Sequence, residues 1–150
     1  LRIRLADANV EITEDDLFRC GGELFASRSY WPILKAGLCA PEYTLRDAMN
    51  VKKGVDLINR EMKYDVVPKL LEGEISRVEV PVFFFLGRHD LNTPSQLAAE
   101  YLARLDAPLK GLVWFEHSAH FPFFEEPDIF HKEMVRVNQT VGEFWNHQVR

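Results

Sequence analysis

The sequence has little cysteine, no long apolar run and no cluster of basic residues. Its two cysteines, Cys20 and Cys39, form neither a disulfide framework nor a metal-ligand pattern. Both lie in segments that we expect to be helical, so we predict buried free thiols and a cytoplasmic protein. No stretch approaches the roughly 18–20 apolar residues of a membrane span. The net charge of −5 provides no basic surface for phosphates. We therefore expect neither a membrane nor a nucleic-acid partner.

The apolar content is nevertheless ample for a packed core. Of the 150 residues, 47% are apolar and 27% are charged, which is typical of one ordinary folded domain. A disordered chain or a coiled coil would need a different composition. The first residue is Leu1 rather than methionine, and we interpret the chain as a segment of a longer protein.

Residues 1–76 read as entirely helical, because no stretch shows the period-two alternation of a half-buried strand. Threonine caps with an acid three residues further on mark two of the expected helix starts. The expected helices run from Thr13 towards Gly21-Gly22, from Tyr30 to Cys39, and from Thr44, with Asp47 at the N3 position, to Val67-Pro68.

Residues 77–150 predict an α/β arrangement. The run from Val80 to Leu86 is apolar at odd and even positions, as in a parallel strand covered on both faces. A capping box, Thr93-Pro94-Ser95-Gln96, predicts a helix that runs to Leu105. The order strand, helix, strand, helix predicts two parallel strands. The later elements are a strand at Leu112–Phe115 and a helix from Pro127 with an apolar stripe of Phe130, Met134, Val137, Val141 and Phe144.

Two parallel strands cannot bury both faces and both edges of a sheet by themselves. An edge strand such as Val82–Leu86 would expose phenylalanines and backbone hydrogen-bonding groups, which invites pairing with another chain. We therefore expect the sheet to be incomplete. Its remaining strands would come from a missing N-terminal half or from a second copy of the chain.

Candidate catalytic residues follow the two expected strands, where functional groups of a parallel sheet gather. Asp90 comes shortly after the first strand, and His117 and His120 come after the second. A carboxylate that accepts the Nδ1 proton of an imidazole fixes its tautomer and stabilises the imidazolium. The Nε2 atom can then take a proton from a hydroxyl nucleophile. Asp90 and His120 therefore have the chemistry of an orienting acid and a general base.

The motifs around this pair resemble the C-terminal end of an α/β-hydrolase. G-x-x-D-x-x-x-P after one strand and H-x-P-x-x-x-E-P after the next are similar to the subgroup that contains proline iminopeptidases and related C–C and ester hydrolases. The resemblance implies that Asp90 is the triad acid and His120 the triad base. It also implies that residues 1–76 form a helical cap and residues 77–150 the C-terminal part of the core. At Ala119 the chain departs from the glycine that is common in this family.

The nucleophile that the resemblance requires is absent from the sequence. In this family the serine precedes the acid and the histidine, on a G-x-S-x-G turn, and upstream loops build the oxyanion hole. We expect the chain alone to be inactive. The parent enzyme would cleave an ester, amide or related acyl bond of a small-molecule or peptide substrate, without a cofactor. None of the serines has the flanking glycines: Ser27, Ser29, Ser76, Ser95 and Ser118.

Other interpretations of the sequence remain open. An aspartate nucleophile on the same turn would make the parent a dehalogenase or an epoxide hydrolase of this fold. A non-catalytic interaction module would associate through its exposed sheet edge. A metal site would use His89, Asp90, His117 and His120, although their spacing lacks the helical pattern of zinc proteases. We interpret His117 as a residue at a strand end and His89 as a supporting or structural residue beside Asp90. Tyr30-Trp31 fits either the lining of a substrate pocket or a surface that the missing half covers.

Overall fold

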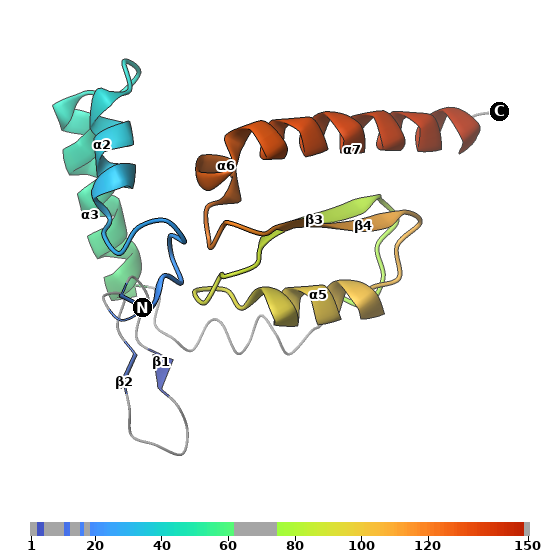
Figure 1. Cartoon of the computed structure of the whole chain (residues 1–150), viewed down its shortest axis with the longest axis horizontal. Coiled ribbons are helices and arrows are strands. Elements are labelled where there is room, and N and C mark those ends of the chain that lie inside the picture. The colour runs from blue at the N-terminus through green and yellow to red at the C-terminus, as the bar shows by residue number, and fades with distance from the viewer. Residues whose placement is uncertain (1–2, 5–10, 13–15, 17–18, 62–74, 149–150) are drawn as a thin grey trace. The chain divides into compact units, whose positions relative to one another are not determined.

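The structure is a computed structural model that describes residues 3–4, 11–12, 16, 19–61 and 75–148 (Figure 1). The chain divides into two compact units. The first combines Leu1–Ser29 with Ser76–Arg150, and the second is Tyr30–Ile75. Within the described ranges, no helix is both long enough and apolar enough to cross a membrane.

The first unit is built on two strands, β3 (Val82–Gly87) and β4 (Lys110–Phe115). They pair in parallel and remain in register from their first residues to their last. Helix α5 (Ser95–Arg104) lies between them in the chain, and helix α7 (Pro127–Gln148) follows. The predicted order of elements and the parallel pairing are thus confirmed, and this unit is a partial α/β fold.

Helices lie on both faces of the two-stranded sheet, with α7 above it and α5 below it in Figure 1. Successive strand residues point to opposite faces. Phe84 accordingly stacks on Tyr101 of α5, with ring centroids 6.3 Å apart. Its neighbour Phe85 packs against Phe130 of α7 at 5.3 Å. This arrangement explains why β3 is apolar at odd and even positions, although most of its residues are only half-buried.

Phe115, the last residue of β4, is fully buried at the centre of the aromatic core. Its ring centroid lies 5.9 Å from that of Phe85 and 5.6 Å from that of Phe130. The predicted apolar stripe of α7 therefore begins with a residue that does face the sheet. The other buried hydrophobic residues among those described are Leu24, Leu102, Leu105, Val113 and Ala119.

Helix α5 starts differently from the prediction. It begins at Ser95, its N-cap residue is Pro94, and no side chain caps it. The hydroxyl of Thr93 instead donates a hydrogen bond to Asp90. The predicted capping box is therefore wrong, because a nearby carboxylate attracts the threonine that would have capped the helix.

The C-terminal end of α5 is held by the first residue of β4. The ammonium group of Lys110 donates to three backbone carbonyl oxygens at 2.7–2.9 Å. A positive charge there satisfies carbonyl groups that have no partner within the helix and offsets the helix dipole. The three acceptors are Leu102, Ala103 and Leu105.

The N-terminal region corrects two predictions. Strands β1 (Ile3–Arg4) and β2 (Glu11–Ile12) pair antiparallel, so residues 1–76 are not entirely helical. Two-residue strands are too short to show an alternating pattern. Cys20 and Cys39 are both exposed, so the prediction of buried thiols is wrong. The position of a cysteine in a helix does not by itself determine whether another element covers its side chain.

The first expected helix lies only partly within the described residues. Asp16, Arg19 and Cys20 are helical. Gly21 has a φ of 75°, the left-handed conformation that glycine commonly adopts at a helix end. The predicted start at Thr13 lies outside the residues that the structure describes.

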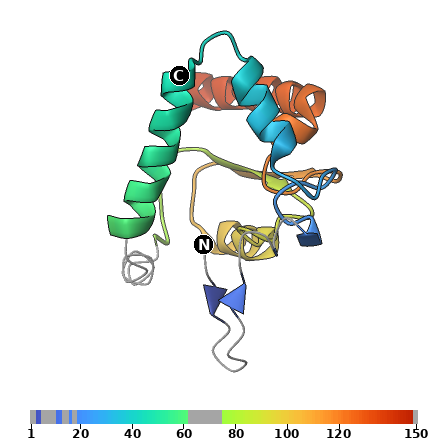
Figure 2. The same ribbon diagram turned by 90° about the vertical axis from the view of Figure 1, so that its left-hand side faces the viewer.

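The second unit contains α2 (Trp31–Cys39) and α3 (Leu45–Glu61), which confirm two predicted helices. Figure 2 shows both helices and the loop that joins them. A reciprocal capping box starts α3. Thr44 donates to the Asp47 carboxylate through its backbone N–H and its hydroxyl, at 2.8 and 2.6 Å, and Asp47 N–H returns a bond to the Thr44 hydroxyl. The expected continuation to Val67-Pro68 lies outside the described residues.

Candidate active site

Asp90 and His120 lie side by side at the carboxyl ends of the two parallel strands. Asp90 follows β3 and His120 follows β4. Nδ1 of the imidazole is 3.0 Å from Oδ2 of the carboxylate. The Asp90 side chain is 8% exposed and that of His120 is 30% exposed. The acid is therefore shielded from solvent, whereas the imidazole remains accessible.

The buried carboxylate of Asp90 has hydrogen-bond partners on both oxygens. Oδ1 accepts the backbone N–H groups of Asn92 and Thr93, both at 2.9 Å. Oδ2 accepts the Thr93 hydroxyl at 2.7 Å, in addition to its contact with His120. Burial alone would raise the pKa of Asp90, but the hydrogen bonds from His120 and Thr93 outweigh it and hold the pKa below its ordinary value.

The same contact has the opposite effect on the pKa of the imidazole, which it raises. The hydrogen bond to Asp90 raises the pKa of His120 above 6.5, against the opposing effect of burial. The negative charges of Asp90 and Glu23 also favour the imidazolium. Because Nδ1 faces the carboxylate, Nε2 is the ring nitrogen that can exchange a proton with a reacting group.

A third segment, residues 22–26, contacts both loops, and we did not predict its role. The N–H of Leu91 donates to the Gly22 carbonyl at 3.2 Å, and the N–H of His120 donates to the Glu23 carbonyl at 3.1 Å. A β-carbon at Gly22 would lie only 2.5 Å from that of Leu91. The Gly21-Gly22 pair is the signal in the sequence, but it predicts a helix end as readily as a close backbone approach.

Glu126 fixes the loop between β4 and His120. Its Oε2 atom accepts the N–H of His117 at 3.0 Å and the hydroxyl of Ser118 at 2.6 Å. Ser118 is fully buried. Glu126 is the acid of the H-x-P-x-x-x-E-P pattern, so this part of the motif holds the loop that carries the histidine. Glu126 directly follows the short helix α6 (Pro122–Glu125).

His89 and His117 do not join the Asp90–His120 pair. Their rings lie against Phe25, with centroid distances of 4.4 Å for His89 and 5.8 Å for His117. His89 Nε2 is 3.1 Å from the carbonyl oxygen of Glu116. Among the residues that the structure describes, no group of three or more His, Cys, Asp or Glu could hold a metal ion. The geometry therefore does not support the metal alternative.

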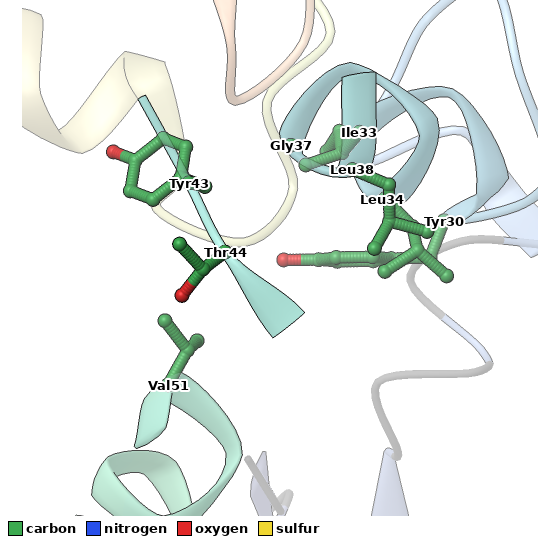
Figure 3. A pocket seen from close by; sticks show the side chains of 8 residues that line it. All are labelled: Tyr30, Ile33, Leu34, Gly37, Leu38, Tyr43, Thr44 and Val51. Atoms are coloured by element: carbon green, nitrogen blue, oxygen red, sulfur yellow. The ribbon is translucent and has the colours of Figure 1, made fainter. Parts of the chain in front are cut away.

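The second unit has an apolar cavity of about 510 Å³. Figure 3 shows side chains of α2 on one side of it and Thr44 and Val51 on another. Tyr30 lines the cavity, whereas the neighbouring Trp31 is 60% exposed. The cavity's lining carries no charged side chain, which suits an apolar, uncharged group. The lining residues are Tyr30, Ile33, Leu34, Gly37, Leu38, Tyr43, Thr44 and Val51.

Comparison with known proteins shows similarity to part of a longer protein. Over 116 residues, 77% of this chain, the sequence is 28% identical to the probable aminopeptidase YbaC of Bacillus subtilis (strain 168). The matched region makes up 36% of that relative, so the chain spans about a third of its length. No protein-family model matches the chain, and no solved structure matches it.

Proposed function

We propose that this chain is the C-terminal portion of a serine hydrolase with an α/β-hydrolase fold, and that the whole protein cleaves amide, ester or related acyl bonds. The observation that carries the proposal is the 3.0 Å contact between His120 Nδ1 and a buried, multiply hydrogen-bonded Asp90. The similarity to a probable aminopeptidase favours amide bonds at the amino end of a peptide. The helical residues within residues 1–76 would form a cap over the substrate.

In the proposed reaction, His120 acts first as a base and then as an acid. Neutral Nε2 accepts the proton of a serine hydroxyl while the serine oxygen attacks the substrate carbonyl carbon. Asp90 remains ionised and stabilises the imidazolium. The imidazolium then protonates the leaving amine or alkoxide, and an acyl-enzyme remains. In the last step, His120 takes a proton from water, which attacks the acyl carbon, and the imidazolium returns that proton to the serine oxygen as the acid product leaves.

The proposal places the nucleophile outside residues 1–150. The sequence has no G-x-S-x-G turn. Ser95 and Ser118 are buried and donate their hydroxyls to the Gly87 carbonyl and to Glu126. The Ser27 hydroxyl donates to the backbone carbonyl of Ser29 and accepts the backbone N–H of Ser29. The hydroxyls of Ser27, Ser95 and Ser118 are therefore in structural contacts that a nucleophile would have to give up.

The test is an assay of the polypeptide encoded by the complete reading frame around residues 1–150. We expect hydrolysis of aminoacyl nitroanilides and labelling of a serine by a fluorophosphonate probe. Asp90→Asn and His120→Ala should each lower kcat by about 10⁴-fold. Asp106→Asn, which changes an exposed carboxylate, should leave kcat unchanged. Full activity in His120→Ala would refute the proposal.

The same assay separates the serine enzyme from its nearest rival. If an aspartate were the nucleophile, the polypeptide would hydrolyse haloalkanes or epoxides and would not react with the fluorophosphonate. Serine labelling that depends on His120 supports the proposal, and haloalkane or epoxide turnover without labelling contradicts it.

A second candidate function, association without catalysis, is favoured by the half-buried residues of β3. A two-stranded sheet leaves backbone groups available to another strand. This alternative predicts a stable complex of the chain with itself in sedimentation velocity experiments. The complex would persist in His120→Ala, and the complete polypeptide would lack hydrolase activity.

A further inference from the structure

We propose that Glu125 is a positioning residue that holds the backbone of His120 where its imidazole can reach Asp90. Its carboxylate joins two segments far apart in the sequence. Oε2 accepts the N–H of Ala119 at 2.8 Å, and Oε1 accepts the N–H of Ala26 at 3.0 Å. The catalytic meaning of this role rests on the proposed function, but the geometry does not.

Both hydrogen bonds act on the immediate surroundings of His120. Ala119 precedes the histidine in the chain and is fully buried. On the other side, the His120 N–H donates to the carbonyl of Glu23, in the same segment as Ala26. Glu125 therefore closes a ring of contacts through residues 23–26 and 119–120. This ring fixes the backbone from which the imidazole projects.

The arrangement requires that both oxygens of the Glu125 carboxylate act as acceptors. A carboxylate offers two acceptor oxygens, and bonds from N–H groups to a charged acceptor are stronger than neutral ones. Glutamine has nearly the same shape but offers one oxygen and one NH₂ group. Glu125→Gln would therefore set an NH₂ group against one of the two backbone N–H donors.

Glu125 acts on His120 by holding its backbone in place and not through its own charge. The carboxylates that raise the pKa of the imidazole are those of Asp90 and Glu23. Removing the charge of Glu125 should therefore change the titration of His120 mainly by loosening its contact with Asp90. Glu133 is a matched control, because it pairs with Arg136 on α7 and its Oε2 is 2.7 Å from the arginine Nε.

The experiment measures the pKa of His120 by NMR titration of histidine-labelled chain, compared between wild type, Glu125→Gln and Glu133→Gln. We expect the pKa to move towards 6.5 in Glu125→Gln and to remain at the wild-type value in Glu133→Gln. A purely structural role would lower the melting temperature and leave the pKa of His120 unchanged. A folded Glu125→Gln chain with the wild-type pKa would overturn the proposal.

Amide hydrogen exchange of the wild-type chain provides a second test if Glu125→Gln does not fold. The N–H groups of Ala26 and Ala119 should exchange slowly, and exchange of either at the rate of an unprotected amide would overturn the proposal. Activity of the complete polypeptide is a separate readout, in which Glu125→Gln should lower kcat at least tenfold with little change in KM. If Glu125→Gln lowers the pKa of His120 but the wild-type polypeptide hydrolyses nothing, the positioning role stands and the proposed function fails.

Discussion

The carbonyl oxygen of Ala119 occupies the space that a side chain at Gly87 would need. A β-carbon at Gly87 would lie 1.9 Å from that oxygen, far inside the closest permitted contact. The two residues belong to the loops that carry Asp90 and His120, and the N–H of His89 donates to the Ser118 carbonyl beside them. Glycine at position 87 therefore allows the acid and histidine loops to approach each other.

Gly87→Ala should destabilise the chain by about 1–3 kcal/mol, because the added methyl group forces the two loops apart. Urea unfolding measures the change. Gly142→Ala is the matched control, since a β-carbon there meets no atom within 4 Å. In the interior of α7 the same substitution should stabilise by about 0.5–1 kcal/mol. Equal effects at the two positions would contradict the close approach.

Asp90→Asn should lower the pKa of His120. The substitution removes the charge and the charged hydrogen bond that raise this pKa above 6.5, while the change in side-chain volume is small. NMR titration of the histidine ring measures the effect in the chain itself. The exposed Asp106→Asn should leave the pKa unchanged. An unaltered titration of His120 in Asp90→Asn would mean that the contact is absent in solution.

The Asp90–His120 contact should contribute most to stability between the ordinary pKa values of its two partners, 3.8 for the carboxyl and 6.5 for the imidazole. The pKa of folded Asp90 is lowered from 3.8, so its contribution is present above that value and is lost as the pH falls through the folded pKa. The pKa of folded His120 is raised from 6.5, so its contribution is present below that value and is lost as the pH rises through the folded pKa. Both shifts report the same contact and are not added together.

Asp90→Asn should therefore flatten the pH dependence of the free energy of unfolding on both sides of this window. Urea unfolding of both proteins from acid to mildly alkaline pH measures it. A wild-type and an Asp90→Asn curve that remain parallel throughout would show that other groups control the pH dependence.

Thr93→Val should destabilise by about 1 kcal/mol, because it removes the hydroxyl that donates to Asp90 Oδ2 at 2.7 Å. Thr93→Ser keeps that hydroxyl and should restore most of the stability. The pKa of Asp90 should rise in Thr93→Val, since one of the hydrogen bonds that lower it is lost. If serine and valine behave alike, the hydroxyl has no role.

Lys110→Met should loosen the end of α5 and destabilise the chain by about 1 kcal/mol. The methionine keeps the apolar stem but cannot donate to the carbonyl groups of residues 102, 103 and 105. Thermal unfolding by circular dichroism measures the loss. Lys132→Met, on the exposed surface of α7, should change stability by less than about 0.5 kcal/mol.

The parallel sheet and the meeting of Asp90 with His120 could be predicted because each depends on local patterns and one general rule. Apolar strands identify the sheet, and polar residues after parallel strands gather at one edge of it. The 3.0 Å contact follows that rule closely. The catalytic role of the pair remains a prediction.

The supporting contacts could not be predicted, because they depend on which distant segment approaches which loop. The Gly21-Gly22 pair predicts the end of a helix, yet the carbonyl groups of Gly22 and Glu23 accept hydrogen bonds from Leu91 and His120. Thr93 has the pattern of a helix cap, yet its hydroxyl binds Asp90. In both cases the local signal was compatible with two structures, and a tertiary partner decided between them.

The second unit leaves the first at Ser29 and returns to it at Ser76. It is thus inserted in the chain between the two parts of the first unit, which contains Glu23, Asp90, His120 and Glu125. We expect that such an insertion can change in length or sequence without altering the pairing of Asp90 with His120, provided that its attachment points at Ser29 and Ser76 stay in place. A substitution within residues 22–26, in contrast, acts on the loop of the imidazole through the bond from His120 to Glu23 and through the two bonds that Glu125 accepts.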